Sequence, residues 1–223
     1  MSTNHSNDYE EFETPAQVYN RLIQLVSNEI QSPEVLPYEE AIVDCIVDQI
    51  QHMNENIKKL QNKLDPFCVE QHKIELERYG YVVNKYLRTR IQKIESQAAS
   101  LIKVVQSNAN LASKLMSRHE IKHLDNYVSG IDNYLNESVL SRLQFSPTPV
   151  MSFKLVDIES DDENIFENTY VFVRALKQTQ MIIEDKNGQN QEIVELEKGT
   201  QHFLPYNAVR RHLVTASKDL LLI

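Results

Sequence analysis

Residues 42–64, IVDCIVDQIQHMNENIKKLQNKL, carry the clearest folding signal in the chain. Apolar residues recur there at intervals of three and four, at positions 42, 46, 50, 53, 57, 60 and 64. This spacing places them along one face of an α-helix of about six turns. A helix with so long an apolar face must bury it against other helices, so the stretch predicts a helical bundle.

The segment before this stretch contains the signals of a helix start and a helix end. In Thr14-Pro15-Ala16-Gln17, Thr14 can cap the helix, proline suits the first helical position, and Gln17 can complete a capping box. Pro33 and Pro37 follow an amphipathic run and are expected to end it. A first helix is therefore predicted between these two signals.

Two more helices are predicted after Asp65-Pro66. One runs over about 67–105, with its apolar face marked by Leu76, Tyr79, Val83, Leu87, Ile91 and Ile94. The other begins at Ser117, where Ser117 and Glu120 form a second capping box, and continues to about Leu143.

The pattern changes at Ser146-Pro147-Thr148-Pro149, which is typical of a hinge because two prolines in three residues disfavour helix. Beyond it, β-branched and aromatic residues favour strands, and Asn187-Gly188 favours a hairpin turn. A second turn is predicted at Lys198-Gly199, and a short helix over about 206–216. The predicted strands include Phe153–Ile158, Tyr170–Leu176, Met181–Ile183 and Ile193–Val194, followed by His202–Leu204 after the second turn.

These elements predict a fold that is mostly α, with a small C-terminal β domain. The predicted organisation is a disordered acidic tail over 1–13, a helical domain over 14–147 and a β-rich domain over 148–223. The tail carries four acidic residues and no basic one, which favours disorder.

The low glycine content excludes two classes of nucleotide-binding protein. The chain has 223 residues and only four glycines, and no two of these lie closer than eleven residues. A phosphate-binding loop of a Walker-type ATPase or a Rossmann unit needs several glycines close together, so both classes are excluded.

The net charge, the length of the apolar runs and the cysteine content bear on ligands, membrane insertion and cellular compartment. The net charge of −9 argues against sequence-independent binding to nucleic acid. No apolar run approaches ~18 residues, so no membrane span is expected. Two cysteines make no disulfide framework, and both are expected to pack in the core of a protein from a reducing compartment.

One motif suggests zinc chemistry. His119-Glu120-Ile121-Lys122-His123 matches H-E-x-x-H, in which two histidines bind zinc and the glutamate activates water. Asn126 and Ser129 stand where a metzincin has glycine and the third ligand, and Glu120 already has a capping role. The match is interpreted as a coincidence: no metal, no cofactor and no catalytic residue are expected, with a zinc metallopeptidase as the remote alternative.

A basic stretch opposes the overall acidity. Between Arg78 and Ile94 there are five basic residues, no acidic one and three tyrosines. Arg78, Tyr81, Lys85 and Arg88 fall on one helical face. Arginine and tyrosine are favoured at protein interfaces, so this face fits a subunit contact. An exposed basic face, or pairing with acids of the same chain, explains the composition equally well.

Several segments give the chain a resemblance to a known family. They are Glu75-Leu76-Glu77-Arg78, Tyr81, Tyr86-Leu87-Arg88-Thr89-Arg90, Lys93-Ile94-Glu95, Tyr170-Val171-Phe172-Val173-Arg174 and Leu196-Glu197-Lys198-Gly199-Thr200-Gln201-His202. Over about residues 14–223 the chain is similar to the GINS subunits of eukaryotic DNA replication, and most of all to those of the SLD-five type.

The resemblance implies a non-catalytic structural subunit of a nuclear heterotetramer. Its partners would be the three other GINS subunits and, through the complex, the MCM ring and the Cdc-forty-five protein of the replicative helicase (CMG). ATP hydrolysis would belong to the MCM ring, and neither direct sequence-specific contact with nucleic acid nor a membrane is implied. An independent helical adaptor protein is the main alternative.

With the resemblance, the basic helix is expected to be a subunit interface. The apolar C-terminus is expected to be buried on the assembly, because leaving it in water would forgo roughly 1.5–3 kcal/mol per side chain. The predicted interface residues are Arg78, Tyr81, Lys85, Tyr86, Arg88 and Arg90, with Leu220, Leu221, Leu222 and Ile223 at the C-terminus.

Overall fold

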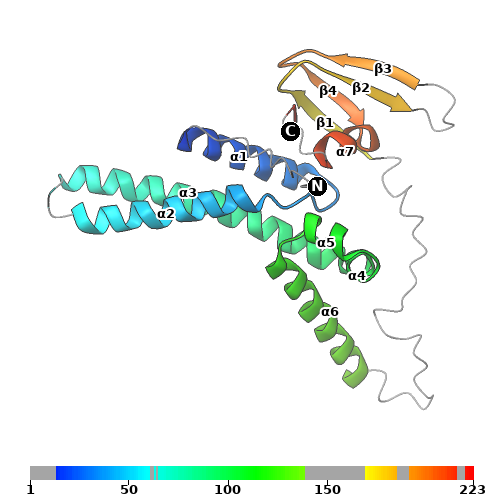
Figure 1. Ribbon diagram of the computed structural model, residues 1–223, viewed down its shortest axis with the longest axis horizontal. Helices are drawn as coiled ribbons and strands as arrows, with labels where there is room; N and C mark the ends of the chain where they lie inside the picture. Colours follow the sequence, from blue (N-terminus) through cyan, green and yellow to red (C-terminus); the bar gives the residue numbers. More distant parts are fainter. Residues whose placement is uncertain (1–13, 61–62, 64, 139–168, 185–190, 215–218) are drawn as a thin grey trace, which may run out of the picture. The chain divides into compact units, whose positions relative to one another are not determined.

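The computed structural model describes residues 14–60, 63, 65–138, 169–184, 191–214 and 219–223 (Figure 1). In the described part of the chain, six helices come first, and the strands follow with one short helix among them, which confirms the predicted fold class. The helices are α1 (Pro15–Gln31), α2 (Glu40–Leu60), α3 (Pro66–Ser96), α4 (Ala98–Ser107), α5 (Ala109–Leu115), α6 (Arg118–Ser138) and α7 (Tyr206–Val214). The strands are β1 (Tyr170–Ala175), β2 (Thr179–Glu184), β3 (Gln191–Leu196), β4 (Gln201–Pro205) and β5 (Leu220–Leu222).

The chain divides into two compact units. The first combines Met1–Leu25 with Glu40–Asn84, and the second combines Val26–Glu39 with Lys85–Ile223. The division falls within α1 and α3, so each of these helices contributes to both units. The predicted tail, the hinge at 146–149, the strand at 153–158 and the turn at 187–188 lie outside the described residues, and the domain boundaries stay predictions.

The predicted capping box at Ser117 is confirmed in full, and the one at Thr14 is confirmed for the bond to Gln17. The backbone N–H of Thr14 donates to Gln17 Oε1 at 3.2 Å. At α6, the N–H of Ser117 donates to Glu120 Oε2 at 2.8 Å, and the N–H of Glu120 donates back to Ser117 Oγ at 3.3 Å. These bonds, reciprocal at α6 and single at α1, satisfy N–H groups at the helix start and help to fix where α1 and α6 begin.

The first unit buries only part of the predicted apolar stripe of α2. Ile42, Val43 and Ile46 are buried, whereas Leu60 at the far end of the helix is 41% exposed. On α1 and α3, the rings of Tyr19 and Tyr79 pack with centroids 4.5 Å apart. The unit therefore retains exposed apolar surface toward the α2–α3 turn.

The predicted helix over 67–105 is wrong in its length, because α3 ends at Ser96 and α4 begins at Ala98. Gln97 leaves helical geometry, with φ −107° and ψ 19°. Its side-chain amide donates to the carbonyl of Pro33 at 2.7 Å, so a residue distant in sequence stabilises the break. Beyond it, Leu101 and Ile102 join a core of buried side chains formed with Val35, Ile94, Ala98, Met116, Leu124 and Val128.

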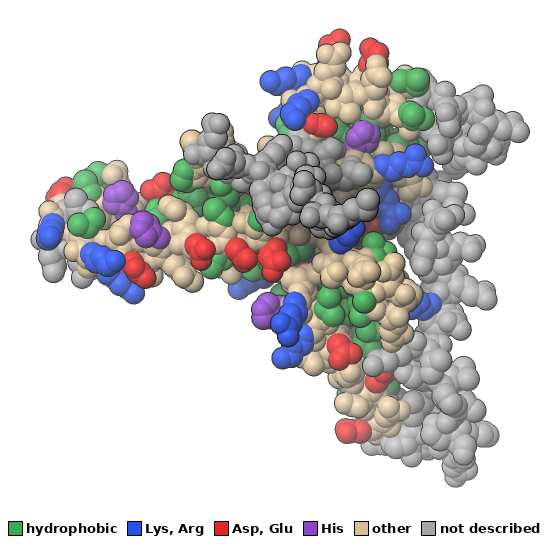
Figure 2. All heavy atoms as spheres, viewed as in Figure 1, with side chains coloured by type: hydrophobic (Ala, Val, Ile, Leu, Met, Phe, Trp, Pro, Cys, Tyr) green, Lys and Arg blue, Asp and Glu red, His purple; other side chains and the backbone are tan. Residues whose placement is uncertain are grey.

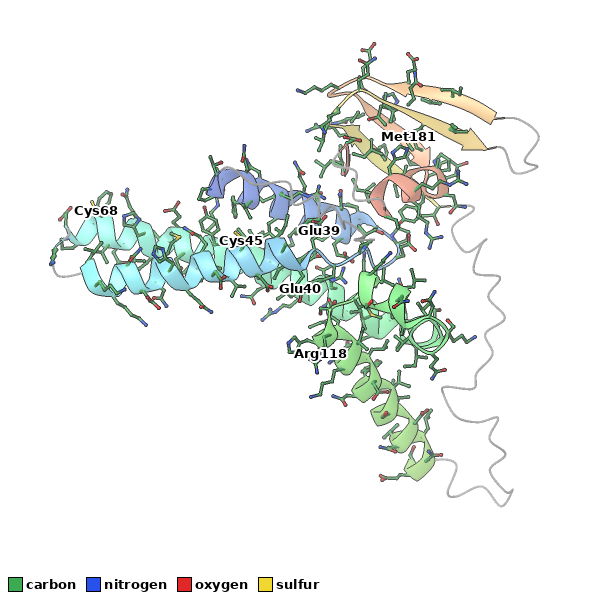
Figure 3. The ribbon with its side chains drawn as sticks, viewed as in Figure 1. Glu39, Glu40, Cys45, Cys68, Arg118 and Met181 are labelled. Carbon is green, nitrogen blue, oxygen red and sulfur yellow. The ribbon has the colours of Figure 1, made fainter. Side chains whose placement is uncertain are left out.

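The C-terminal strands form two antiparallel sheets. In the three-stranded sheet β1 lies between β4 and β5, and β2 pairs with β3 in the other sheet. The inward residues of both sheets share one core with α7, in which Met181 and Leu196 are fully buried. Figure 1 shows the sheets and α7, and Figure 3 labels Met181. The predicted turn at 198–199 is confirmed, and Gly199 has a φ of +90° that favours glycine.

The last strand is held on both of its edges. Leu222 pairs with Val173 of β1 on one side. On the other side, the N–H of Leu222 donates to Asn28 Oδ1 and its carbonyl accepts from Ser27 Oγ, both at 2.8 Å. Side chains of α1 thus satisfy backbone groups that an edge strand would leave open.

Candidate functional site

The structure separates the predicted interface residues of α3 into two groups. Arg78, Tyr81, Lys85 and Arg88 are exposed, and Tyr81 reaches 65% exposure. We call these four residues the α3 basic face. Tyr86 and Arg90 are 1% and 0% exposed, so the chain itself covers them. Assigning them to a subunit interface is therefore corrected.

Arg90 is the centre of a buried ionic cluster in the second unit. Its Nε and Nη2 donate to the two carboxylate oxygens of Glu120 at 2.7 and 3.2 Å. Its Nη1 donates to Glu29 Oε2 at 3.0 Å and to the carbonyl of Leu36 at 2.6 Å, and Nη2 donates to the carbonyl of Leu115 at 2.9 Å. All five N–H groups of the guanidinium are used, which is what a buried arginine requires.

Lys93 extends this cluster to the loop after α1. Its Nζ donates to Glu29 Oε1 at 3.2 Å and to the carbonyl of Glu34 at 2.9 Å. Two cations, Arg90 and Lys93, thus meet two carboxylates, those of Glu29 and Glu120. We call these four residues the Arg90 network; it ties α1, α3 and α6 together.

Two tyrosine rings flank the guanidinium. Its carbon atom lies 5.2 Å from the ring centroid of Tyr38 and 5.6 Å from that of Tyr86, within the range of cation–π attraction. Burial works against the charge of Arg90, but its hydrogen bonds to Glu120 and the neighbouring groups raise its pKa overall. Burial lowers the pKa of Lys93, against the attraction of Glu29. Arg90 is thus the firmly charged centre of the network.

The helical register explains why Arg90 is buried while Arg88 is not. The buried residues Val83, Tyr86, Arg90 and Ile94 step by three and four along α3. The predicted apolar face passed through Ile91 instead, which is 37% exposed. The sequence signal for a buried arginine was the position of Arg90 among apolar residues at helical spacing. Its acidic partners, Glu29 and Glu120, are too distant in sequence to be predicted from that spacing.

The geometry at the H-E-x-x-H match does not fit a zinc peptidase. The Glu120 carboxylate is buried and bound to Arg90 and Ser117, so it does not face a water position beside the histidines. His123 Nε2 lies 3.0 Å from Glu95 Oε1, while His119 is exposed. Within the described ranges, no group of three or more His, Cys, Asp or Glu residues is placed to hold a metal ion.

The C-terminal residues are covered by their own chain. Leu220 and Leu222 are 1% and 0% exposed in the core beneath β1, whereas Ile223 is 43% exposed. The chain's own sheet covers Leu220 and Leu222, so assigning these two leucines to a subunit interface is corrected.

A second polar cluster joins α7 to the loop after α1. The Tyr206 hydroxyl lies 2.9 Å from Ser32 Oγ and donates to Glu34 Oε1 at 2.9 Å. Arg210 binds the same carboxylate through Nε and Nη2, at 2.7 and 2.8 Å. Burial, followed by the charge of Glu34, raises the pKa of Tyr206. Sequence reasoning missed this cluster, because its members are more than 170 residues apart.

The described residues also include surface charges of both signs and two cysteines. Basic and acidic side chains are interspersed over the described surface in view in Figure 2. Cys45 on α2 and Cys68 on α3 are free and lie well apart (Figure 3). The prediction that both pack in the core is wrong, since Cys45 is exposed and Cys68 is half-buried. Of the described helices, none is long and apolar enough to cross a membrane.

Comparisons with known proteins agree with this organisation. Residues 44–139 match a family model described as the GINS complex protein helical bundle domain. Residues 167–220 match a model described as the DNA replication complex GINS protein SLD5 C-terminus. The two models together cover well over half of the chain, in the same order as the helices and strands.

Relatives from distant eukaryotes match nearly the whole chain, and all bear the name DNA replication complex GINS protein SLD5. The human protein is 28% identical over 210 residues, which are 93% of this chain and 91% of the relative. The Arabidopsis thaliana protein is 28% identical over 219 residues, or 97% and 96%. The Dictyostelium discoideum protein is 23% identical over 195 residues, or 87% of each. The chain belongs to the GINS family and is a subunit of the SLD5 type.

Proposed function

We propose that this chain is a non-catalytic structural subunit of a heterotetrameric GINS complex and that the α3 basic face contacts a neighbouring subunit. The observation that carries the proposal is the exposure of all four residues of that face, on a helix whose buried cation Arg90 is instead satisfied within the chain. A cationic and aromatic face of this kind has the composition of a protein interface.

The anchoring of α3 supports this role. Lys85 and Arg88 lie within two turns of Arg90, whose side chain is fixed by five hydrogen bonds. A contact surface on a fixed helix loses less conformational entropy on binding than one on a mobile loop. The Arg90 network would thus hold half of the contact surface in place before a partner arrives.

The wider role follows from the family. In a GINS complex, the chain would help to join the MCM ring and the Cdc-forty-five protein in the replicative helicase, in the nucleus, during initiation and elongation of DNA replication. It would contribute no catalytic group, and sequence-specific contact with DNA would not be part of its role. A net charge of −9 supports contacts through proteins rather than directly with DNA.

Charge reversal tests the proposed contact. The full chain carrying Arg78→Glu and Arg88→Glu would be co-expressed with the three other GINS subunits of its source. The matched control carries Lys114→Glu and Arg118→Glu, two exposed cations on α5 and α6.

We expect the first variant to reduce the recovered tetramer at least tenfold without changing the helical signal in circular dichroism. The control should assemble as the unmodified chain does. Full assembly of the first variant would remove the α3 basic face from the proposed interface.

A further inference from the structure

The outward face of the three-stranded sheet carries three exposed aromatic rings. Tyr170, Phe172 and Phe203 are 51%, 58% and 58% exposed. They come from β1, in which exposed and buried residues alternate, and from β4, in which Phe203 is exposed and the next residue, Leu204, is buried. Exposed aromatic side chains gathered on one face of a sheet commonly mark an interaction site. We call these three residues, with Arg174, the aromatic face.

The rings form one ordered group. Phe172 and Phe203 are directly opposed in the β1–β4 register, with centroids 4.8 Å apart. Tyr170 stacks on Phe203 at 5.3 Å. The residues between them, Val171 and Leu204, are buried on the inner face, so the backbone beneath the rings is anchored. A preorganised aromatic group contributes contact area at little entropic cost.

A single positive charge borders the rings. Arg174 is the one charged residue that β1, β4 and β5 carry, as the described strands show, and it is exposed. Its register partners are Gln201 on β4 and Leu221 on β5, so it lies between a polar and an apolar side chain. A ligand that complements this face brings apolar side chains to the rings and a carboxylate to Arg174.

The size of the face limits its occupant. An aromatic side chain buries 150–250 Å² when fully covered, so three rings a little more than half exposed offer roughly 300 Å². Ile223, which is hydrogen-bonded to Phe172 through its backbone and is 43% exposed, adds less than one such ring. A stable association between folded proteins buries about 800 Å² on each partner. The aromatic face is therefore too small for a second copy of the chain and suits a short peptide segment.

We propose that the aromatic face binds a short segment of a partner protein that carries aliphatic side chains and an acidic residue, with the acid paired to Arg174. Single-stranded nucleic acid fits less well. Bases need free ring faces, whereas Phe203 already packs against both of its neighbours. The site is distinct from the α3 basic face, so it can exist whether or not that face is a subunit contact.

Selection from a phage library of random 16-residue peptides tests the proposal. The bait is the full chain co-expressed with the three other GINS subunits. Three variants accompany it: Phe172→Thr with Phe203→Thr, Arg174→Glu alone, and a control with Ile182→Thr and Ile193→Thr. The control residues are 51% and 65% exposed and directly opposed on the other sheet. Threonine keeps the strand propensity in each case.

We expect the selected peptides to combine aliphatic residues with Asp or Glu. Their affinity should fall at least tenfold on the Phe172/Phe203 variant and stay unchanged on the control. Selection on the Arg174→Glu variant should yield peptides with Lys or Arg in place of the acid.

Other outcomes overturn the proposal. Selection of no peptide, as a face covered by another subunit would give, contradicts an open docking site. Peptides without an acid contradict the role of Arg174. Two further results would assign the face to a different ligand: binding of a 20-nucleotide oligothymidine that the Phe172/Phe203 variant loses, or self-association lost by the same variant.

Discussion

Two faces of the same part of α3 carry similar side-chain types in opposite environments. The α3 basic face presents arginine, lysine and tyrosine to solvent, whereas Tyr86 and Arg90 bury the same side-chain types. The difference comes from the helical register, which turns Arg90 toward Glu29 and Glu120. The composition of a helix indicates that its side chains form polar contacts. Whether these contacts lie within the chain or with another subunit depends on which residues face them in the tertiary structure.

Removing the buried charge should have the largest effect on stability. Arg90→Met would leave the carboxylates of Glu29 and Glu120 buried without their main cation. Breaking a buried ion pair from one side costs about 3–5 kcal/mol. The free energy of unfolding of the full chain, measured by denaturant titration, should fall by that amount. A loss below about 1 kcal/mol would show that Arg90 is as dispensable as a surface charge.

Neutralising the carboxylate of Glu120 should have an intermediate effect on stability. Glu120→Gln keeps a side chain that can reach Ser117 but removes the charge opposite Arg90. Hydrogen bonds to charged groups contribute about 1.5–3 kcal/mol, and we expect a destabilisation in that range. Asp125→Asn, an exposed position on the same helix, is the matched control and should change stability by less than about 0.5 kcal/mol. Equal effects of the two changes would contradict the assigned role of Glu120.

Lys93 should contribute less to stability than Arg90, because burial disfavours the charged form of Lys93 and lowers its pKa. Lys93→Met should cost about 1 kcal/mol near neutral pH. Below its ordinary pKa of 10.5 the unfolded chain holds this proton more tightly than the folded chain. The stability of the unmodified chain relative to Lys93→Met should therefore rise as pH increases toward that value. Denaturant titrations across this alkaline range would check the sign, and a falling difference would contradict it.

A substitution in the α3 basic face should have the smallest effect on stability. Arg88→Met removes a solvated cation and should change the free energy of unfolding by no more than about 0.5 kcal/mol. Thermal unfolding followed by circular dichroism is sufficient to measure this. A loss of stability comparable to that of Arg90→Met would mean that Arg88 also has a partner within the chain. It would contradict the distinction between the exposed and the buried face of α3.

Local signals were the part of the fold that sequence could predict. The capping boxes at Thr14 and Ser117, the strand around Tyr170 and the turn at Gly199 depend on residues within a few positions of one another. The break at Gln97 was missed because its stabilising contact, with Pro33, is 64 residues away.

The same limit applied to the candidate site. The α3 basic face could be predicted because its spacing lies within one helix. The Arg90 network could not, since its pairs join residues 61 and 30 positions apart. Burial of the C-terminal leucines followed from their apolarity, but the partners Ser27 and Asn28 on α1 depend on the tertiary fold.

The central claim is that this chain completes its own core and still needs neighbours for its exposed α3 basic face. Light scattering of the purified chain, alone and co-expressed with the three other GINS subunits, tests it most directly. We predict one complex with a single copy of each chain; the lone chain, which completes its own core, should stay folded and should join that complex when the three other subunits are present. A well-behaved monomer that ignores those partners would contradict the claim and favour an independent adaptor.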